Sequence, residues 1–173
     1  MAKQYYTEKG ELKEIEVDKI YMTRAGYESA KAHLKYLQTT KRDEIVQRIA
    51  EARGHGDLSE NAEYDAARNE QAANEGEIVE LEYKLKNREV FAAPSSVEFV
   101  TFGTKVIAYD EDFDEEVVYE ITGTLEADVD EGRISNESPV GMALIGAKAG
   151  EKIFVDLGNG RGYELLIKTI ELA

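Results

Sequence analysis

Apolar residues recur every three or four positions over two long stretches of the chain. In the first stretch they form a stripe of roughly 120° on a helix turning 100° per residue, and its members are Tyr27, Ala30, Leu34, Leu37, Ile45, Ile49 and Ala52. Lys41 falls inside this stripe, so we expect its stem to be buried and its amine to reach solvent. The pattern predicts a helix capped by Thr23 and ended by Gly54.

A second helix is predicted to begin after Asp57. We expect its first half to present three alanines to the first helix and its second half to present larger apolar residues; these are Ala62, Ala66, Ala73, Ile78, Leu81 and Leu85, with Asn69 and Gly76 on the same face. Gly54 and Gly56 separate the two helices, and neither helix contains proline. Residues 22–92 are therefore predicted to form an antiparallel helical hairpin with its tip at 54–61.

The predicted hairpin is long and narrow. Each arm has about 30 residues, which at about 1.5 Å per residue gives a rod of roughly 45 Å. A dimerisation coiled coil is the alternative, but the closing Gly-x-Gly turn favours pairing within one chain.

Beyond a linker at 92–96 the pattern changes to period two, which is typical of strands. Two hairpins are predicted, one from segments 104–109 and 116–122 and one from segments 152–156 and 163–171. Between them Ser138 and Pro139 have the order of a helix cap and first helical residue for a short helix over 140–145. Residues 93–173 are thus predicted to be a small antiparallel α+β domain. Residues 1–21 are treated as an N-terminal extension with a short alternating stretch at 11–17, either a strand or an arm packed on the body.

The chain of 173 residues carries a net charge of −15 and no cysteine. Through Ala92 there are 15 basic and 19 acidic residues, a balance of −4, and after it 6 basic and 17 acidic, a balance of −11. This excess argues against bulk nucleic-acid binding, which needs many cations, and favours docking on a protein surface. Without an apolar run near 18 residues, the protein is expected to be cytoplasmic and away from membranes.

Three apparent motifs fail on closer reading. Asp110-x-Asp112-x-Asp114 begins like a calcium loop, but Glu115 stands at its sixth position and Ile121 at its twelfth. The glycines at 158–162 lie between strands and lack the third glycine of a dinucleotide fingerprint. His33 and His55 lack zinc-ligand spacing.

The predicted tip carries the strongest candidate chemistry. Asp57 and Glu60 have the spacing of a capping box, which stabilises a helix start. They are also two carboxylates at the end of a rod, and Mg²⁺ binds one or two carboxylates with waters and phosphate oxygens. Both interpretations stay open from the local sequence alone, and the second requires the remaining ligands to come from another molecule.

Two segments resemble the bacterial Gre transcript-cleavage factors. The longer segment is Ile49-Ala-Glu-Ala-Arg-Gly-His-Gly-Asp-Leu-Ser-Glu-Asn-Ala-Glu-Tyr64 with Ala66-Ala-Arg68, and the second is Ile134-Ser-Asn-Glu-Ser-Pro139 with Ala143-Leu-Ile-Gly146. The resemblance extends from about Tyr21 to the C-terminus. It implies a coiled-coil hairpin followed by an FKBP-like domain, for which no isomerase activity is expected because a set of pocket aromatics is missing.

The resemblance also implies a mechanism. Ser138 and Pro139 would dock the second domain on RNA polymerase at the rim of its secondary channel, and the hairpin would run down to the catalytic centre. There Asp57 and Glu60 would help hold a Mg²⁺ shared with the polymerase, which then hydrolyses the extruded 3′ end of the nascent RNA. The chain itself is expected to be a monomer without enzymatic activity and without a stably bound cofactor.

Further tip residues have a role only through the resemblance. Asn61 and Tyr64 would position the acids or the RNA. Arg48, Arg53 and Arg68 would contact the RNA, with salt bridges along the hairpin as the alternative. The two-acid pattern favours an activator; the alternatives are a related protein that blocks the channel and inhibits, and a coiled-coil scaffold unrelated to transcription.

Overall fold

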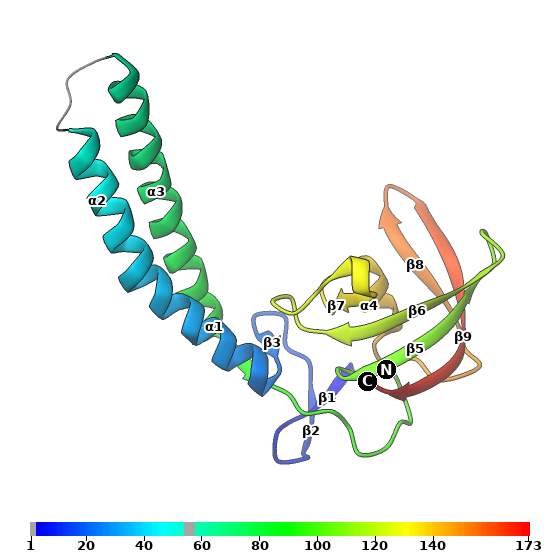
Figure 1. The fold of residues 1–173 in the computed structure, drawn as a ribbon. Helices are drawn as coiled ribbons and strands as arrows, with labels where there is room; N and C mark the ends of the chain where they lie inside the picture. The colour runs from blue at the N-terminus through cyan, green and yellow to red at the C-terminus, as the bar shows by residue number, and fades with distance from the viewer. Residues whose placement is uncertain (1–2, 54–57) are drawn as a thin grey trace. The chain divides into compact units, whose positions relative to one another are not determined.

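The chain folds into two compact units in the computed structural model (Figure 1). The sheet unit contains residues 1–26 and 88–173, and the helical unit contains residues 27–87. The described residues are 3–53 and 58–173, and for 58–61 only the backbone is described. The helical unit is therefore inserted between two sequence segments of the sheet unit.

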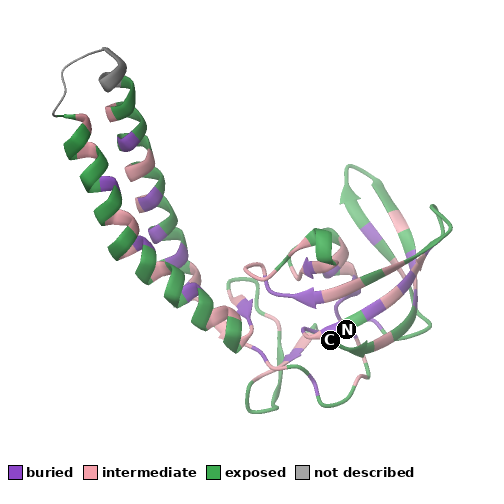
Figure 2. Ribbon diagram, viewed as in Figure 1, coloured by how far each residue is buried: buried purple, intermediate pink, exposed green. Residues whose placement is uncertain are grey.

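The helical unit is built from two paired arms. The first arm is continuous and consists of α1 (Arg24–Tyr36), a π-helical turn η1 (Leu37–Lys41) and α2 (Arg42–Ala52). The second arm is the single helix α3 (Leu58–Lys86). The arms run antiparallel and side by side, with their buried residues on the facing sides (Figures 1 and 2). The predicted helical hairpin is confirmed.

The first arm buries the face predicted from its apolar stripe. Leu37 and Ile45 are almost fully buried, with 3% and 1% of their surface exposed. Lys41 is half-buried, and its amine reaches Glu70 on the second arm at 2.6 Å. The Thr23 hydroxyl accepts a hydrogen bond from the Gly26 N–H at 2.9 Å, so the predicted cap is confirmed.

The buried residues of the second arm repeat more regularly than was predicted from its sequence. Its buried residues recur with heptad spacing and are Ala67, Asn74, Ile78, Leu81 and Leu85. The predicted face of the tip half was wrong, because all five residues expected there are exposed, namely Ala62, Ala66, Asn69, Ala73 and Gly76. A straight helix with 100° per residue drifts by about 20° per heptad relative to such a seam. An apolar stripe predicted with that geometry over the whole arm therefore turns away from the face that contacts the first arm.

The spacing of the buried residues in the first arm is irregular at the π turn. Ile45 lies eight positions after Leu37, one more than a heptad, whereas the second arm keeps intervals of seven from Ala67 to Asn74 and from Asn74 to Leu81. The first arm thus carries one extra residue against a regular partner. A π turn accommodates one extra residue in an otherwise α-helical stretch, and η1 lies between these two buried positions.

The sheet unit contains a five-stranded sheet ordered β7-β6-β5-β9-β8. Its strands are β5 (Thr104–Asp110), β6 (Glu115–Thr122), β7 (Arg133–Ser135), β8 (Lys152–Gly158) and β9 (Arg161–Leu172). Both predicted hairpins are confirmed, with antiparallel pairs β5–β6 and β8–β9. The prediction of a purely antiparallel sheet was wrong, since β7 pairs parallel with β6. Three residues are too short to give a period-two signal, and the 3-10 turn η2 (Val129–Glu131) precedes them.

One apolar cluster fills the sheet unit. It joins residues from β5, β6, β8 and β9 with Leu144 of helix α4 (Pro139–Leu144), and Val106, Leu144 and Leu165 have no exposed surface. The acidic loop between β5 and β6 is closed by Asp110, whose carboxylate accepts N–H bonds from Asp112 at 2.9 Å and Phe113 at 3.2 Å. That carboxylate therefore serves the turn.

The N-terminal residues are woven into the same unit. Strand β1 (Gln4–Tyr6) pairs with β2 (Leu12–Glu14), and β3 (Ile20–Met22) pairs parallel with β4 (Arg88–Val90). Tyr5 is 2% exposed, and its ring centroid lies 4.9 Å from that of Tyr21 and 6.3 Å from that of Phe102. The segment predicted to be an N-terminal extension thus contributes an aromatic anchor to the core. Part of its predicted alternating stretch forms strand β2.

No helix within the described ranges is long and apolar enough to cross a membrane.

Gly123 tests the close approach of two segments of the sheet unit. A Cβ at this position would lie 1.7 Å from the Tyr21 carbonyl oxygen. We expect Gly123→Ala to lower the free energy of unfolding by about 1–3 kcal/mol through overpacking, measured by urea denaturation. Gly76→Ala is the control, because a Cβ there meets nothing within 4 Å, and alanine should stabilise the helix by up to about 1 kcal/mol. Equal effects of the two substitutions would contradict this packing.

Tyr5 tests whether the N-terminal hairpin stabilises the sheet unit. Tyr5→Ala removes a buried ring and should cost about 3–5 kcal/mol in unfolding free energy. Leu12→Ala in the paired strand removes a side chain that is 43% exposed and should change stability by about 0.5 kcal/mol or less. A Tyr5→Ala protein as stable as the parent in urea would mean that the hairpin is not anchored.

Candidate functional site

The acidic tip predicted from sequence lies mostly outside the described part of the chain. Asp57 is outside the described residues, and for Glu60 and Asn61 only the course of the backbone is described. Helix α3 begins at Leu58, directly after Asp57. The capping and metal-binding interpretations of the two acids both stay predictions. The described residues that lead up to the tip are the remaining basis for a site.

Arg53 and Tyr64 form a pair across the two arms next to the tip. The guanidinium carbon of Arg53 lies 5.6 Å from the centre of the Tyr64 ring, and its Nη2 donates to the Tyr64 hydroxyl at 3.4 Å. The hydrogen bond from Arg53, followed by the charges of Arg53 and Arg68, lowers the pKa of the Tyr64 hydroxyl. Two residues that the sequence placed in one motif are thus brought together, one at the end of each arm.

Arg48 takes part in an ion cluster further from the tip. Its Nη1 lies 2.5 Å from one carboxylate oxygen of Glu70, and its Nη2 donates to the other at 2.9 Å. Lys41 adds a third contact, with its amine 2.6 Å from Glu70. Hydrogen bonds from Lys41, and then from Arg48, lower the pKa of the Glu70 carboxyl. For Arg48 this geometry is the salt-bridge alternative, and the contact ties the two arms together.

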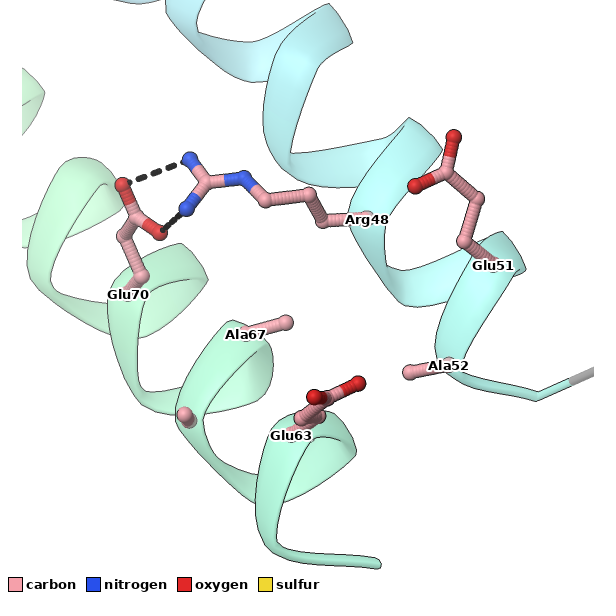
Figure 3. Close-up of a pocket in the computed structure, with 7 residues that line it drawn as sticks. Arg48, Glu51, Ala52, Glu63, Ala67 and Glu70 are labelled. Atoms are coloured by element: carbon pink, nitrogen blue, oxygen red, sulfur yellow. Dashed lines mark hydrogen bonds and ion pairs between the residues drawn. The ribbon is translucent and has the colours of Figure 1, made fainter. Parts of the chain in front are cut away.

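A groove runs between the arms beside this cluster (Figure 3). It has a volume of about 480 Å³, and its lining residues are Arg48, Glu51, Ala52, Glu63, Ala66, Ala67 and Glu70. Figure 3 shows the Arg48–Glu70 pair on one side of the groove, with Glu51 and Glu63 contributed by opposite arms nearer the tip. The small side chains of Ala52 and Ala67 leave the space that the charged residues surround.

Arg68 lies apart from the Arg48–Glu70 cluster. Its Nη1 donates to the side-chain oxygen of Gln71 at 2.6 Å within helix α3, and its side chain is exposed. Among the residues with described side chains, no cluster of three or more His, Asp or Glu is placed to hold a metal ion.

Ser138 and Pro139 open helix α4 in the sheet unit. The Ser138 hydroxyl accepts from the Gly141 N–H at 3.0 Å and donates to the Ser135 carbonyl at 2.7 Å, with Pro139 as the first helical residue. The predicted cap is confirmed. A Cβ on Gly141 would stand 2.1 Å from the Ser135 carbonyl oxygen, so this turn requires glycine.

Sequence reasoning missed the partners in these contacts. The acidic partners Glu70 and Glu75 pair with Arg48 and Arg42 respectively, and nothing in the sequence distinguishes them from the other glutamates of the second arm. Their pairing depends on the register between the arms, and the apolar pattern of one arm alone does not determine that register. A heptad alignment of both arms is the signal that would have found them.

Comparisons with known proteins cover both units. Residues 20–90 match the family described as transcription elongation factor, N-terminal, and residues 94–172 match transcription elongation factor, GreA/GreB, C-term. The N-terminal hairpin of β1 and β2 precedes the matched residues.

Individual relatives are similar over most of their length. A protein named transcription elongation factor GreA from Chelativorans sp. (strain BNC1) is 50% identical over 152 residues, which are 87% of this chain and 97% of that protein. A GreA from Clostridium botulinum (strain Eklund 17B / Type B) is 50% identical over 141 residues, 80% of this chain and 88% of that protein. The solved structure of GreA factor homolog 1 from Thermus thermophilus is 26% identical, with a match that covers 88% of this chain and 99% of that one at a TM-score of 0.40.

The resemblance inferred from the tip motif and from residues 134–146 is therefore confirmed by matches that together cover residues 20–90 and 94–172. The chain belongs to the GreA/GreB family of transcription elongation factors.

Proposed function

We propose that this protein enters the secondary channel of bacterial RNA polymerase and stimulates hydrolysis of the 3′ transcript extruded in backtracked complexes. The observation that carries the proposal is the family match over both units, because the tip motif lies inside the first matched segment. The helical hairpin supports it physically. A paired-helix arm can carry a small acidic group into a narrow space that a globular domain cannot enter.

The tip acids are the residues that act in this proposal. Asp57 and Glu60 present hard carboxylate oxygens, which are the ligands Mg²⁺ prefers, and two carboxylates leave room for water and phosphate oxygens. When bound, Mg²⁺ lowers the pKa of a coordinated water and stabilises charge on phosphate oxygens. Asp57 and Glu60 would hold the shared ion, and Asn61 and Tyr64 would keep the carboxylates oriented. The bonds are broken in the active site of the polymerase, so this protein is an accessory factor without catalysis of its own.

The three arginines near the tip have different contacts, and these contacts assign them different roles in the proposal. Arg48 already directs both terminal guanidinium nitrogens, Nη1 and Nη2, to Glu70, so its role in the proposal is to stiffen the hairpin. Arg53 faces an aromatic ring across the arms, and a guanidinium held there contacts an RNA phosphate at the tip. Arg68 is exposed on helix α3 and adds positive charge on that side.

The finer features of the fold also belong to this proposal. The paired arms behave as a coiled coil, and the sheet unit is an FKBP-like docking domain without isomerase activity. Ser138 and Pro139, held by the cap of helix α4, contact the polymerase at the rim of the channel. The protein acts as a cytoplasmic monomer. The competing function, a channel-blocking inhibitor, is separated by the sign of its effect on purified polymerase.

The tip acids provide the first test. Asp57→Asn and Glu60→Gln keep the side-chain shape and remove the charge, so cleavage of stalled transcripts should fall by about 100-fold or more, the scale of losing a preorganised catalytic contact. Binding to polymerase and thermal melting should stay unchanged. Asp65→Asn is the matched control, since it removes one exposed negative charge from helix α3, which begins directly after Asp57 and contains Glu60. Normal cleavage by both tip variants would refute the mechanism, and slowed synthesis without cleavage by the parent would favour the inhibitor.

Arg53 and Arg48 provide a paired test of the RNA contact. Arg53→Ala should slow cleavage about tenfold, the loss expected for one charge-assisted contact. Arg48→Ala should lower the melting temperature slightly and leave cleavage within about threefold, because an exposed ion pair contributes about 1 kcal/mol or less. The measurement is the cleavage rate at saturating factor. The assignment fails if Arg48→Ala is the slower of the two variants.

A further inference from the structure

Asn74 is the one buried polar side chain among the described residues of the helical unit, with 4% of its surface exposed. It lies on the seam of the second arm between Ala67 and Ile78, at a position where the heptad repeat expects an apolar residue. An apolar cluster joins the two arms here, with Leu37 and Leu34 from the first arm and Ile78 and Leu81 from the second. An amide buried in such a place lowers the stability of the fold unless its polar atoms are hydrogen-bonded.

The amide of Asn74 makes one specific bond. Its Nδ2 donates to the backbone carbonyl of Leu37 on the opposite arm at 3.2 Å. Its Oδ1 is buried and has no hydrogen-bond partner among the described residues. The side chain therefore leaves part of its hydrogen-bonding capacity unused, whereas a leucine of the same branched shape would bury apolar surface here without that loss.

The carbonyl that Asn74 reaches belongs to the first residue of the π turn η1. Within the same stretch the Thr39 hydroxyl donates to the Lys35 carbonyl at 2.7 Å. Side chains thus serve two carbonyls around this turn, one from the same arm and one from the opposite arm. Side-chain insertion into the backbone ladder is a recognised cause of local helix distortion.

The π turn is also where the two arms differ in repeat length. The first arm has eight positions from Leu37 to Ile45, while the second arm keeps sevens throughout its described seam. If the extra residue were absorbed elsewhere along the arm, the segment between the two locations would rotate by about 100°. Ile45 or the residues before it would then leave the seam, so the location of the π turn sets the register.

We propose that Asn74 fixes the register between the two arms by holding the π turn at Leu37, and that it thereby positions the tip. A single buried asparagine in a helical seam sets register in this way at some expense of stability. The ion pairs across the arms, such as Arg42 with Glu75 at 2.7 Å, remain partly open to solvent. Such pairs contribute about 1 kcal/mol or less each, so they stiffen the hairpin but discriminate less strongly between registers than a buried amide does. Asn74 is a positioning residue, and its effect on cleavage rests on the proposed function.

The test replaces the amide with an apolar group of the same branched shape. Asn74→Leu is combined with Val46→Cys and Val79→Cys, two exposed positions on opposite arms, in a chain that has no cysteine of its own. Spin labels at the two cysteines report the distribution of distances between the arms without polymerase. The parent should give one narrow maximum, and Asn74→Leu a broadened or second maximum, although its melting temperature is equal or higher.

The matched control is Asn87→Leu. Asn87 also donates its amide to a backbone carbonyl, that of Tyr83 at 3.0 Å, but it directly follows helix α3 and its bond stays on the same arm. This variant should keep the distance distribution of the parent. Asn74→Ala removes the amide without adding apolar volume, so it should broaden the distribution even if Asn74→Leu fails to fold.

Transcript cleavage supplies the second readout. With the tip displaced, Asn74→Leu should cleave about 10- to 100-fold more slowly at saturating factor, while a merely structural asparagine would change cleavage only together with stability. Parent-like distances in both Asn74 variants overturn the proposal. If the parent itself fails to stimulate cleavage, the proposed function fails, whereas a broadened distribution in the variants still supports the register role.

Discussion

Two helices that meet along one narrow apolar stripe must keep a single alignment over the whole length of the hairpin. Among the described side chains, each arm contributes only a few that are almost fully buried, such as Leu37 and Ile45 on one and Ile78 on the other. At about 25 cal/mol per Å² of buried apolar surface, so few contacts leave a small margin between the correct alignment and its neighbours. The position of every residue near the tip depends on that alignment.

The contacts next to the tip follow from the same alignment. Arg53 meets Tyr64, and Arg48 and Lys41 meet Glu70, because the seam brings those levels of the two arms together. The small residues Ala52 and Ala67 leave a groove between them. A displacement of one arm would separate all of these partners at once, so the local chemistry near the tip has no stability independent of the seam.

Features of the fold that arise from short stretches of sequence were predictable. The caps at Thr23 and Ser138, the first arm and both sheet hairpins depend on residues close together in the chain, and the sequence predicted each of them. The parallel strand β7, the face of the second arm and the π turn depend on partners elsewhere, and period alone did not reveal them. Of the site, the sequence predicted the motif that contains Arg53 and Tyr64 and gave salt bridges as an alternative role for Arg48, but it did not identify the partner Glu70.

The parallel pairing of β3 with β4 joins residues 20–22 to residues 88–90, on either side of the inserted helical unit. During synthesis from the N-terminus, both arms are made before β4 exists. The arms form mainly contacts between residues near in sequence and can pair early, whereas the sheet unit must wait for its distant half and then bring the aromatic anchor Tyr5 against Phe102. The helical hairpin formed by the two arms is therefore the part of this protein that the nascent chain can complete first.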